Sequence, residues 1–184
     1  MSRYANSIAY TSRKANTDLS GQVRFAKAGE AVSATSNELA MTPKLVGELI
    51  RIDTVEITSA ELLALATTPK TIVAAPGAGL FVEFISAQLI LNYATTQYTE
   101  AADNFAVRYT NGSGAIVSEA VETTGWIDQA ADTLTNAIPK KDNIVAATGI
   151  VNQALVLDNT NANIAAGDST VSVRIAYRIV ASGL

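Results

Sequence analysis

The amino-acid sequence predicts an all-β protein: a jelly-roll-like β-sandwich with an extended N-terminal arm and one or two short helices. From residue 51 onward, short segments of alternating apolar and polar residues follow one another, with turn residues between them. These segments are rich in β-branched and aromatic residues, which favour strands. Strands do not alternate with long helical patterns, as they would in a parallel α/β fold. About eight strands at this spacing are typical of a sandwich or jelly roll.

The chain is expected to divide into an N-terminal arm with a short β-hairpin, residues 1–50, and a sandwich body, residues 51–184. Residues 1–17 are polar with isolated apolar side chains, so they have no core of their own. Residues 23–27 alternate apolar and basic side chains, which predicts a short strand of the hairpin. Ordering such a segment costs about 1–2 kcal/mol per residue. We therefore expect the arm to be ordered by docking on a partner or on a sister subunit.

The body opens with a predicted strand followed by a predicted short helix. Residues 51–57 alternate and indicate the strand. A capping box follows, in which the Thr58 hydroxyl accepts a hydrogen bond from the amide of Glu61, and the Glu61 carboxylate accepts one from the amide of Thr58. This motif predicts a helix over 59–66, and Pro69 prevents its continuation.

The longest apolar segment spans residues 80–93, and its β-branched and aromatic side chains predict a strand. Its alternation slips near Ser86 and Ala87, which predicts a bulge. Residues 111–114, Asn-Gly-Ser-Gly, indicate a hairpin turn. Residues 115–121 either pair back from this turn or form a loop. The remaining predicted strands are 70–75, 104–110, one that starts at 125–127, 132–138, 153–158 and 169–181.

Charge is unevenly distributed along the chain. Residues 1–27 contain five basic residues and one acidic residue, whereas residues 28–184 contain eight basic and sixteen acidic residues. Either the segment is a solvated tail with incidental charge, or it is a basic arm that reaches an acidic partner. Nucleic acid is not an expected partner, because the arm has no dense Lys/Arg run and the acidic body would repel phosphates.

The composition excludes several kinds of chemistry. The chain has no histidine and no cysteine, so it has no disulfide, no imidazole base, no thiolate nucleophile and no Cys/His zinc site. Ser113 lies in the Gly-Ser-Gly turn without the spacing of a nucleophile elbow. Residues 158–163 lack the full pattern of a calcium loop and indicate an Asn-rich loop. We expect no enzyme activity, no catalytic residues, no metal and no cofactor.

Aromatic and acidic side chains are the remaining candidates for carbohydrate chemistry. Trp126 is expected in the core or in an interface rather than in a sugar platform. Tyr93 and Tyr98 are expected as surface aromatics of a loop. Four carboxylates are expected as solvated loop charges rather than as the acid–base pair of a glycosidase: Glu119, Glu122, Asp128 and Asp132.

Membrane insertion and secretion are not expected. No segment approaches the roughly 20 consecutive apolar residues of a spanning helix. The N-terminus lacks the apolar stretch of a signal peptide. The sequence therefore predicts synthesis in the cytoplasm.

Two stretches resemble the capsid decoration (cement) proteins of tailed bacteriophages. The first is residues 18–27, Asp-Leu-Ser-Gly-Gln-Val-Arg-Phe-Ala-Lys, which looks like the opening Asp-Leu-Ser strand and turn of cement domains. The second is similar to β-rich virion proteins encoded among phage head genes. It runs from residues 68–79 through 109–114 to 153–157 and 173–178.

This resemblance implies a structural virion protein on the outer capsid surface, made in the host cytoplasm, that stabilises the capsid by bridging capsomers. The implied partners are the major capsid protein and further copies of the chain, with a homotrimer favoured and a homodimer possible. We expect basic side chains of the arm to supply electrostatic docking and aromatic ones to supply apolar anchors. These capsid-binding candidates are Arg3, Tyr4, Tyr10, Arg13, Lys14, Arg24, Phe25 and Lys27.

Two alternatives remain open. The chain can be another phage virion component, namely a tail, neck or fibre protein. It can also be a carbohydrate-binding β-sandwich module, in which Trp126 and the tyrosines would form the platform.

Overall fold

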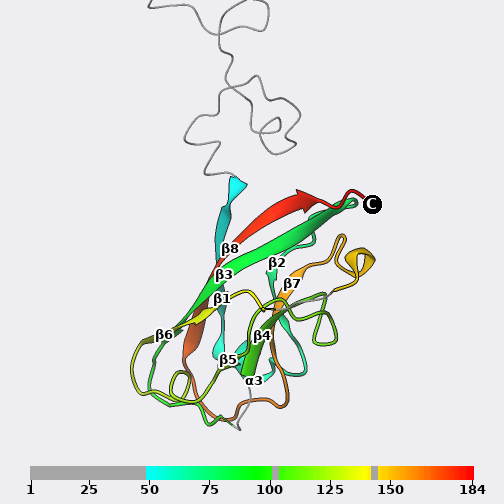
Figure 1. Cartoon of the computed structure of the whole chain (residues 1–184). Helices are drawn as coiled ribbons and strands as arrows, with labels where there is room; N and C mark the ends of the chain where they lie inside the picture. Colours follow the sequence, from blue (N-terminus) through cyan, green and yellow to red (C-terminus); the bar gives the residue numbers. More distant parts are fainter. Residues whose placement is uncertain (1–48, 101–103, 142–144) are drawn as a thin grey trace, which may run out of the picture. The chain divides into compact units, whose positions relative to one another are not determined.

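The computed structural model describes residues 49–100, 104–141 and 145–184, and these residues form a β-sandwich of two antiparallel four-stranded sheets (Figure 1). One sheet has the strand order β1-β8-β3-β6 and the other β2-β7-β4-β5. The predicted all-β sandwich is confirmed, whereas the predicted arm lies outside the described residues except for its last two. The elements are β1 (Arg51–Ile57), α3 (Ser59–Leu63), β2 (Lys70–Val73), β3 (Leu80–Asn92), β4 (Asn104–Tyr109), β5 (Val121–Glu122), β6 (Thr133–Ala137), the 3-10 helix η1 (Ala147–Gly149), β7 (Leu155–Asn159) and β8 (Thr170–Ala181).

The two longest strands, β3 and β8, pair along their whole length and form the centre of the first sheet (Figure 1). The pairing runs from Leu80 opposite Ala181 to Asn92 opposite Thr170. Its register shifts between Phe84 and Ser86, so the bulge predicted from the sequence is present. β1 pairs with the outer side of β8, and β6 pairs with the outer side of β3.

The second sheet is centred on β4 and β7 and has an irregular edge. β5 contains only two residues, but the segment before it also follows β4 through a bridge between Arg108 and Ile116. The Val117 amide donates a hydrogen bond of 2.8 Å to the carbonyl oxygen of Val107. Residues 115–121, which the sequence left open between strand and loop, therefore form a broken edge strand.

The predicted strand start at residues 125–127 is wrong, because these residues form a turn. The amides of Trp126 and Ile127 both donate hydrogen bonds to the carbonyl oxygen of Thr123, at 3.2 and 3.0 Å. Gly125 has a φ of 79°, a conformation that glycine adopts without steric cost. The turn points both apolar side chains into the core.

The short helix α3 begins at the predicted capping box. The Thr58 hydroxyl accepts a hydrogen bond from the amide of Glu61 at 3.4 Å, and the Glu61 carboxylate accepts one from the amide of Thr58 at 3.0 Å. Glu61 also forms an ion pair with Lys70 at the start of β2. The helix is shorter than the predicted 59–66, although Leu65 packs beyond its end and is as fully buried as Leu62.

The core lies between the two sheets. Its largest fully buried side chains include Leu89, Leu91 and Ile175 from the first sheet and Phe105 and Leu157 from the second. Phe105 meets the edge of Trp126, with ring centroids 5.6 Å apart and planes at 87°. The Tyr109 hydroxyl on β4 donates a hydrogen bond to the carbonyl oxygen of Val82 on β3, which ties one sheet to the other. Burial raises the pKa of Tyr109 to about 12, with a smaller contribution from Glu83.

Two loops at one end of the sandwich are held together by Asp168. Its carboxylate accepts hydrogen bonds from the amides of Thr95 at 3.1 Å and Thr96 at 2.8 Å, and another from the Thr95 hydroxyl. These hydrogen bonds, chiefly the one from the Thr95 hydroxyl, lower the pKa of Asp168. Gly167 is required beside it, because an added Cβ would lie 2.2 Å from the ring of Tyr98.

We predict that Phe105→Ala will lower the free energy of unfolding by about 3–5 kcal/mol, because it leaves a cavity beneath Trp126. Leu184→Ala is the control. The Leu184 side chain is 73% exposed and lies outside the strands, so its loss should change stability by less than about 0.5 kcal/mol. Urea denaturation of both variants measures the difference. Equal losses would show that Phe105 does not anchor the core.

We also predict that Asp168→Asn will lower the melting temperature at neutral pH but not in strong acid. The folded state holds the pKa of Asp168 below its usual value of 3.8. Its contribution is therefore fully present above that value and is lost as the pH falls through the folded-state pKa. Melting curves of both proteins between pH 7 and pH 2 should converge. A constant difference at every pH would contradict the prediction.

Candidate interaction surface

The eight capsid-binding candidates from the sequence lie outside the described residues, so the structure does not place them. They are Arg3, Tyr4, Tyr10, Arg13, Lys14, Arg24, Phe25 and Lys27. They stay predictions. The described residues contribute a different surface, which was not predicted from the sequence.

This surface is the outer face of the first sheet, formed by the outward side chains of β1, β8, β3 and β6. Successive strand residues point to opposite faces, so the register of the four strands determines which side chains are neighbours. Ile52 lies beside Ala176, which lies beside Ser86. The next row contains Thr54, Arg174, Gln88 and Asn136, and the third contains Glu56, Ser172, Ile90 and Leu134.

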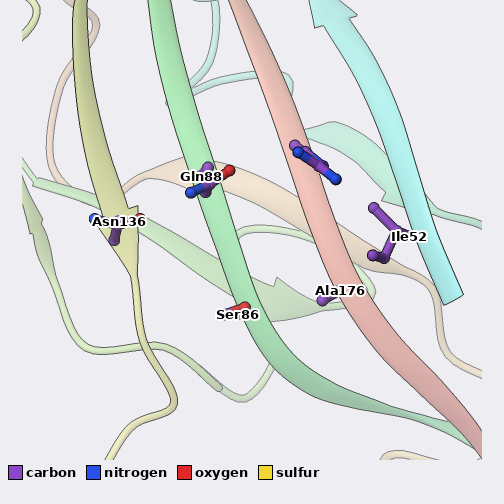
Figure 2. A pocket seen from close by; sticks show the side chains of 6 residues that line it. Ile52, Ser86, Gln88, Asn136 and Ala176 are labelled. Atoms are coloured by element: carbon purple, nitrogen blue, oxygen red, sulfur yellow. The ribbon is translucent and has the colours of Figure 1, made fainter. Parts of the chain in front are cut away.

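A shallow hollow of about 320 Å³ lies on the outer face and is shown in Figure 2. Ser86 and Gln88 come from β3, Asn136 from β6, Ala176 from β8 and Ile52 from β1. Ser86 and Ala176 are small, whereas their neighbours are longer. The hollow therefore forms because the short side chains of Ser86 and Ala176 lie next to longer ones. Arg174 completes its lining.

The outer face combines neutral hydrogen-bonding groups with apolar side chains at its edges, and it also carries Arg174, Glu56 and the exposed Glu83–Arg178 ion pair. Ile52 on β1 and Leu134 on β6 are 55% and 51% exposed, and Ile138, which directly follows β6, is 55% exposed. They are half of the six large apolar side chains that the described residues expose. Interfaces are characteristically depleted in charge at their centre but retain arginine. The composition of the outer face, with Arg174 among amides and hydroxyls, suits protein–protein contact.

The aromatic residues singled out in the sequence lie elsewhere. Trp126 is 4% exposed and packs on Phe105, so its expected core position is confirmed and a sugar platform at this residue is wrong. Tyr98 is also buried, which contradicts its expected place on the surface. Its hydroxyl donates a hydrogen bond to the carbonyl oxygen of Ser169, and burial raises its pKa to about 12. Tyr93 is half-buried and bonds to the carbonyl oxygen of Thr95 at 2.7 Å.

Three of the four loop carboxylates hold turns. Glu119 accepts a hydrogen bond from the amide of Lys141 at 2.8 Å, Asp128 from the amide of Gly125 at 2.9 Å, and Asp132 from the amide of Tyr93 at 2.8 Å. Within the described part of the chain, no three acidic side chains converge as a metal site would require. No helix among the same residues is long and apolar enough to cross a membrane.

A buried ion pair between β4 and β7 was not predicted from the sequence. Arg108 Nε lies 2.8 Å from Asp158 Oδ2, and the two side chains are 14% and 3% exposed. Asp158 was predicted as the last residue of the strand 153–158 and also as the first of the Asn-rich loop, and Asn159 was predicted in that loop. Both belong to β7 and are buried. The apolar run 155–157 continues directly into these residues, and this continuity is the sequence feature that indicates a longer strand.

No known protein family matches the chain, and no curated protein is significantly similar to it.

Proposed function

We propose that this chain is a structural, non-enzymatic protein of a tailed-phage virion that binds the outer capsid surface and stabilises it by bridging capsomers. Its partners in this proposal are the major capsid protein and further copies of itself, with a homotrimer favoured and a homodimer possible. It would be made in the host cytoplasm and reside on the capsid exterior. The proposal rests on the resemblance carried by residues 18–27 and by the strand and turn sequences of the body.

The observation that carries the proposal is the composition of the outer face. The central row of this face combines amides and hydroxyls with a single arginine, and the edge strands carry apolar side chains. This central part can be covered by another protein at low desolvation cost. Ile52 and Leu134 lie on the two edge strands of that face and would supply apolar contacts. We assign this face to contacts between copies of the chain.

The strand order supports a jelly-roll topology. Its pairs are β1 with β8, β2 with β7, β3 with β6 and β4 with β5, the pairs that a single long hairpin makes when it folds into two sheets. Jelly rolls occur in viral capsid proteins and in lectins. A fold does not by itself assign a function, so this agreement is secondary to the surface.

In the proposed mechanism, the arm binds the capsid and the body connects neighbouring copies. Basic side chains such as Arg13 and Lys14 would face acidic groups of the major capsid protein, while Tyr4, Tyr10 and Phe25 would enter apolar depressions. An interface of standard size, roughly 1,600 Å², would offset the cost of ordering the arm. Repetition over the shell adds avidity, so moderate contacts suffice for stable decoration.

We predict that deletion of residues 1–27 will abolish binding to empty capsid shells and leave the melting temperature of the body unchanged. The full-length chain should pellet with shells in a fixed ratio, and light scattering should report a small oligomer. A truncated protein that still decorates shells would overturn the assignment of the arm. Full-length protein located on tails, necks or fibres of particles would favour the alternative virion role.

We further predict that Ile52→Asp will weaken self-association at least about tenfold, because burying an unpaired carboxylate in an interface costs more than about 1.4 kcal/mol. The control is Thr71→Asp, which places the same charge at an exposed position on an edge strand of the other sheet. Light scattering should move Ile52→Asp toward the monomer mass of 19.2 kDa and leave Thr71→Asp as an oligomer. The same oligomer in both variants would remove the outer face from the interface.

A further inference from the structure

A polar hollow of about 420 Å³ lies between three segments that are distant in the sequence. They are the loop between α3 and β2, the turn that follows β4, and the end of β7. We call this site the polar hollow. Its lining residues are Ala66, Thr67, Pro69, Asn111, Gly112, Ser113, Asp158, Asn159, Thr160 and Asn161.

Two of these residues are buried and retain hydrogen-bonding atoms without a partner. Asp158 and Asn159 are each 2% exposed. Within the described residues, Asp158 Oδ1 and both side-chain amide atoms of Asn159 have no hydrogen-bond partner. Leaving such a group unsatisfied costs about 1–3 kcal/mol, so native proteins pair these groups with water or with a ligand. Asp158 lines the polar hollow with Gly112, which lies next to Oδ1. Asn159 follows it in β7, so its side chain points to the core face of the second sheet.

The position of Asp158 is fixed by the ion pair with Arg108. Arg108 Nε lies 2.8 Å from Oδ2, which leaves Oδ1 for another donor. Gly112 lies next to this oxygen, because a Cβ added to Gly112 would be 3.3 Å from Oδ1. A glycine at this position therefore keeps the carboxylate within reach of the polar hollow.

The charges and donors of the polar hollow select the class of ligand. A cation would be opposed by Arg108, which already neutralises the one carboxylate. An anion would be repelled by the Asp158 carboxylate. A neutral hydroxyl can donate to Asp158 Oδ1, and a neighbouring hydroxyl can donate to or accept from the Ser113 hydroxyl and the Asn161 amide. The volume also falls within the range of small-ligand sites, about 300–1,000 Å³.

We propose that the polar hollow binds a neutral, polyhydroxylated ligand, namely a saccharide. Asp158 would accept a hydrogen bond from one of its hydroxyls, and Ser113 and Asn161 at the rim are exposed and can add further hydrogen bonds. This site is distinct from Trp126 and does not depend on capsid binding. Loss of sugar binding and loss of decoration are therefore separate results.

The test uses the full-length chain and four probes: the methyl glycosides of D-glucose, D-galactose, D-mannose and N-acetyl-D-glucosamine. Saturation-transfer NMR at millimolar concentration should detect at least one of them, and a titration should give its affinity. Gly112→Ala should weaken that affinity at least about tenfold, because the added methyl group stands over Asp158 Oδ1. Gly149→Ala is the matched control, since its Cβ would meet only the Ala146 side chain, at 3.9 Å.

Asn161→Ala provides a second variant at the exposed rim in case Gly112→Ala destabilises the fold, and it should also weaken binding. Absence of saturation transfer from all four glycosides would overturn the proposal. Equal affinity in Gly112→Ala, Asn161→Ala and the wild type would place any sugar site elsewhere. Saturable chemical-shift changes of these residues with calcium instead of a glycoside would identify a cation site and also overturn it. Capsid pelleting of Gly112→Ala should remain unchanged, which separates this result from the proposed decoration role.

Discussion

The pairing of β3 with β8 is the interaction on which the rest of the described structure depends. These strands join residues about 90 positions apart, and each supplies alternate side chains to the core and to the outer face. β1 and β6 attach to their free edges, so both the width of the first sheet and the rows of the outer face follow from this register. A shift by one residue would place Arg174 in the core and Val173 in solvent.

The second sheet is fixed against the first by a small set of side chains. Leu157 and Phe105 fill the interior, and Trp126 closes it from a turn rather than from a strand. The Tyr109 hydroxyl connects the sheets through the Val82 carbonyl group. Burial raises the pKa of Tyr109 far above neutrality, so this donor keeps its proton under physiological conditions.

Polar side chains at the ends and faces of the sandwich have two different roles. Asp168 is satisfied by three donors and holds two loops together. Asp158 is equally well positioned by Arg108, yet one of its oxygens has no partner among the described residues. Buried groups that are positioned but unsatisfied destabilise a fold unless a ligand or water completes them. For this reason we place a binding function at Asp158 and a structural one at Asp168.

The sequence by itself determined the local features of this protein, because they depend on neighbours in the chain. Alternation predicted the strands, and the Thr58–Glu61 capping box predicted the start of α3. Only the tertiary structure decided which strands are neighbours. Ile52, Ser86 and Asn136 share one hollow, and Arg108 reaches Asp158, because long-range pairing brings together residues that no local pattern relates. Trp126 is a further example. Its apolar character predicted burial, but only the tertiary structure shows that it reaches Phe105 from a turn rather than from a strand.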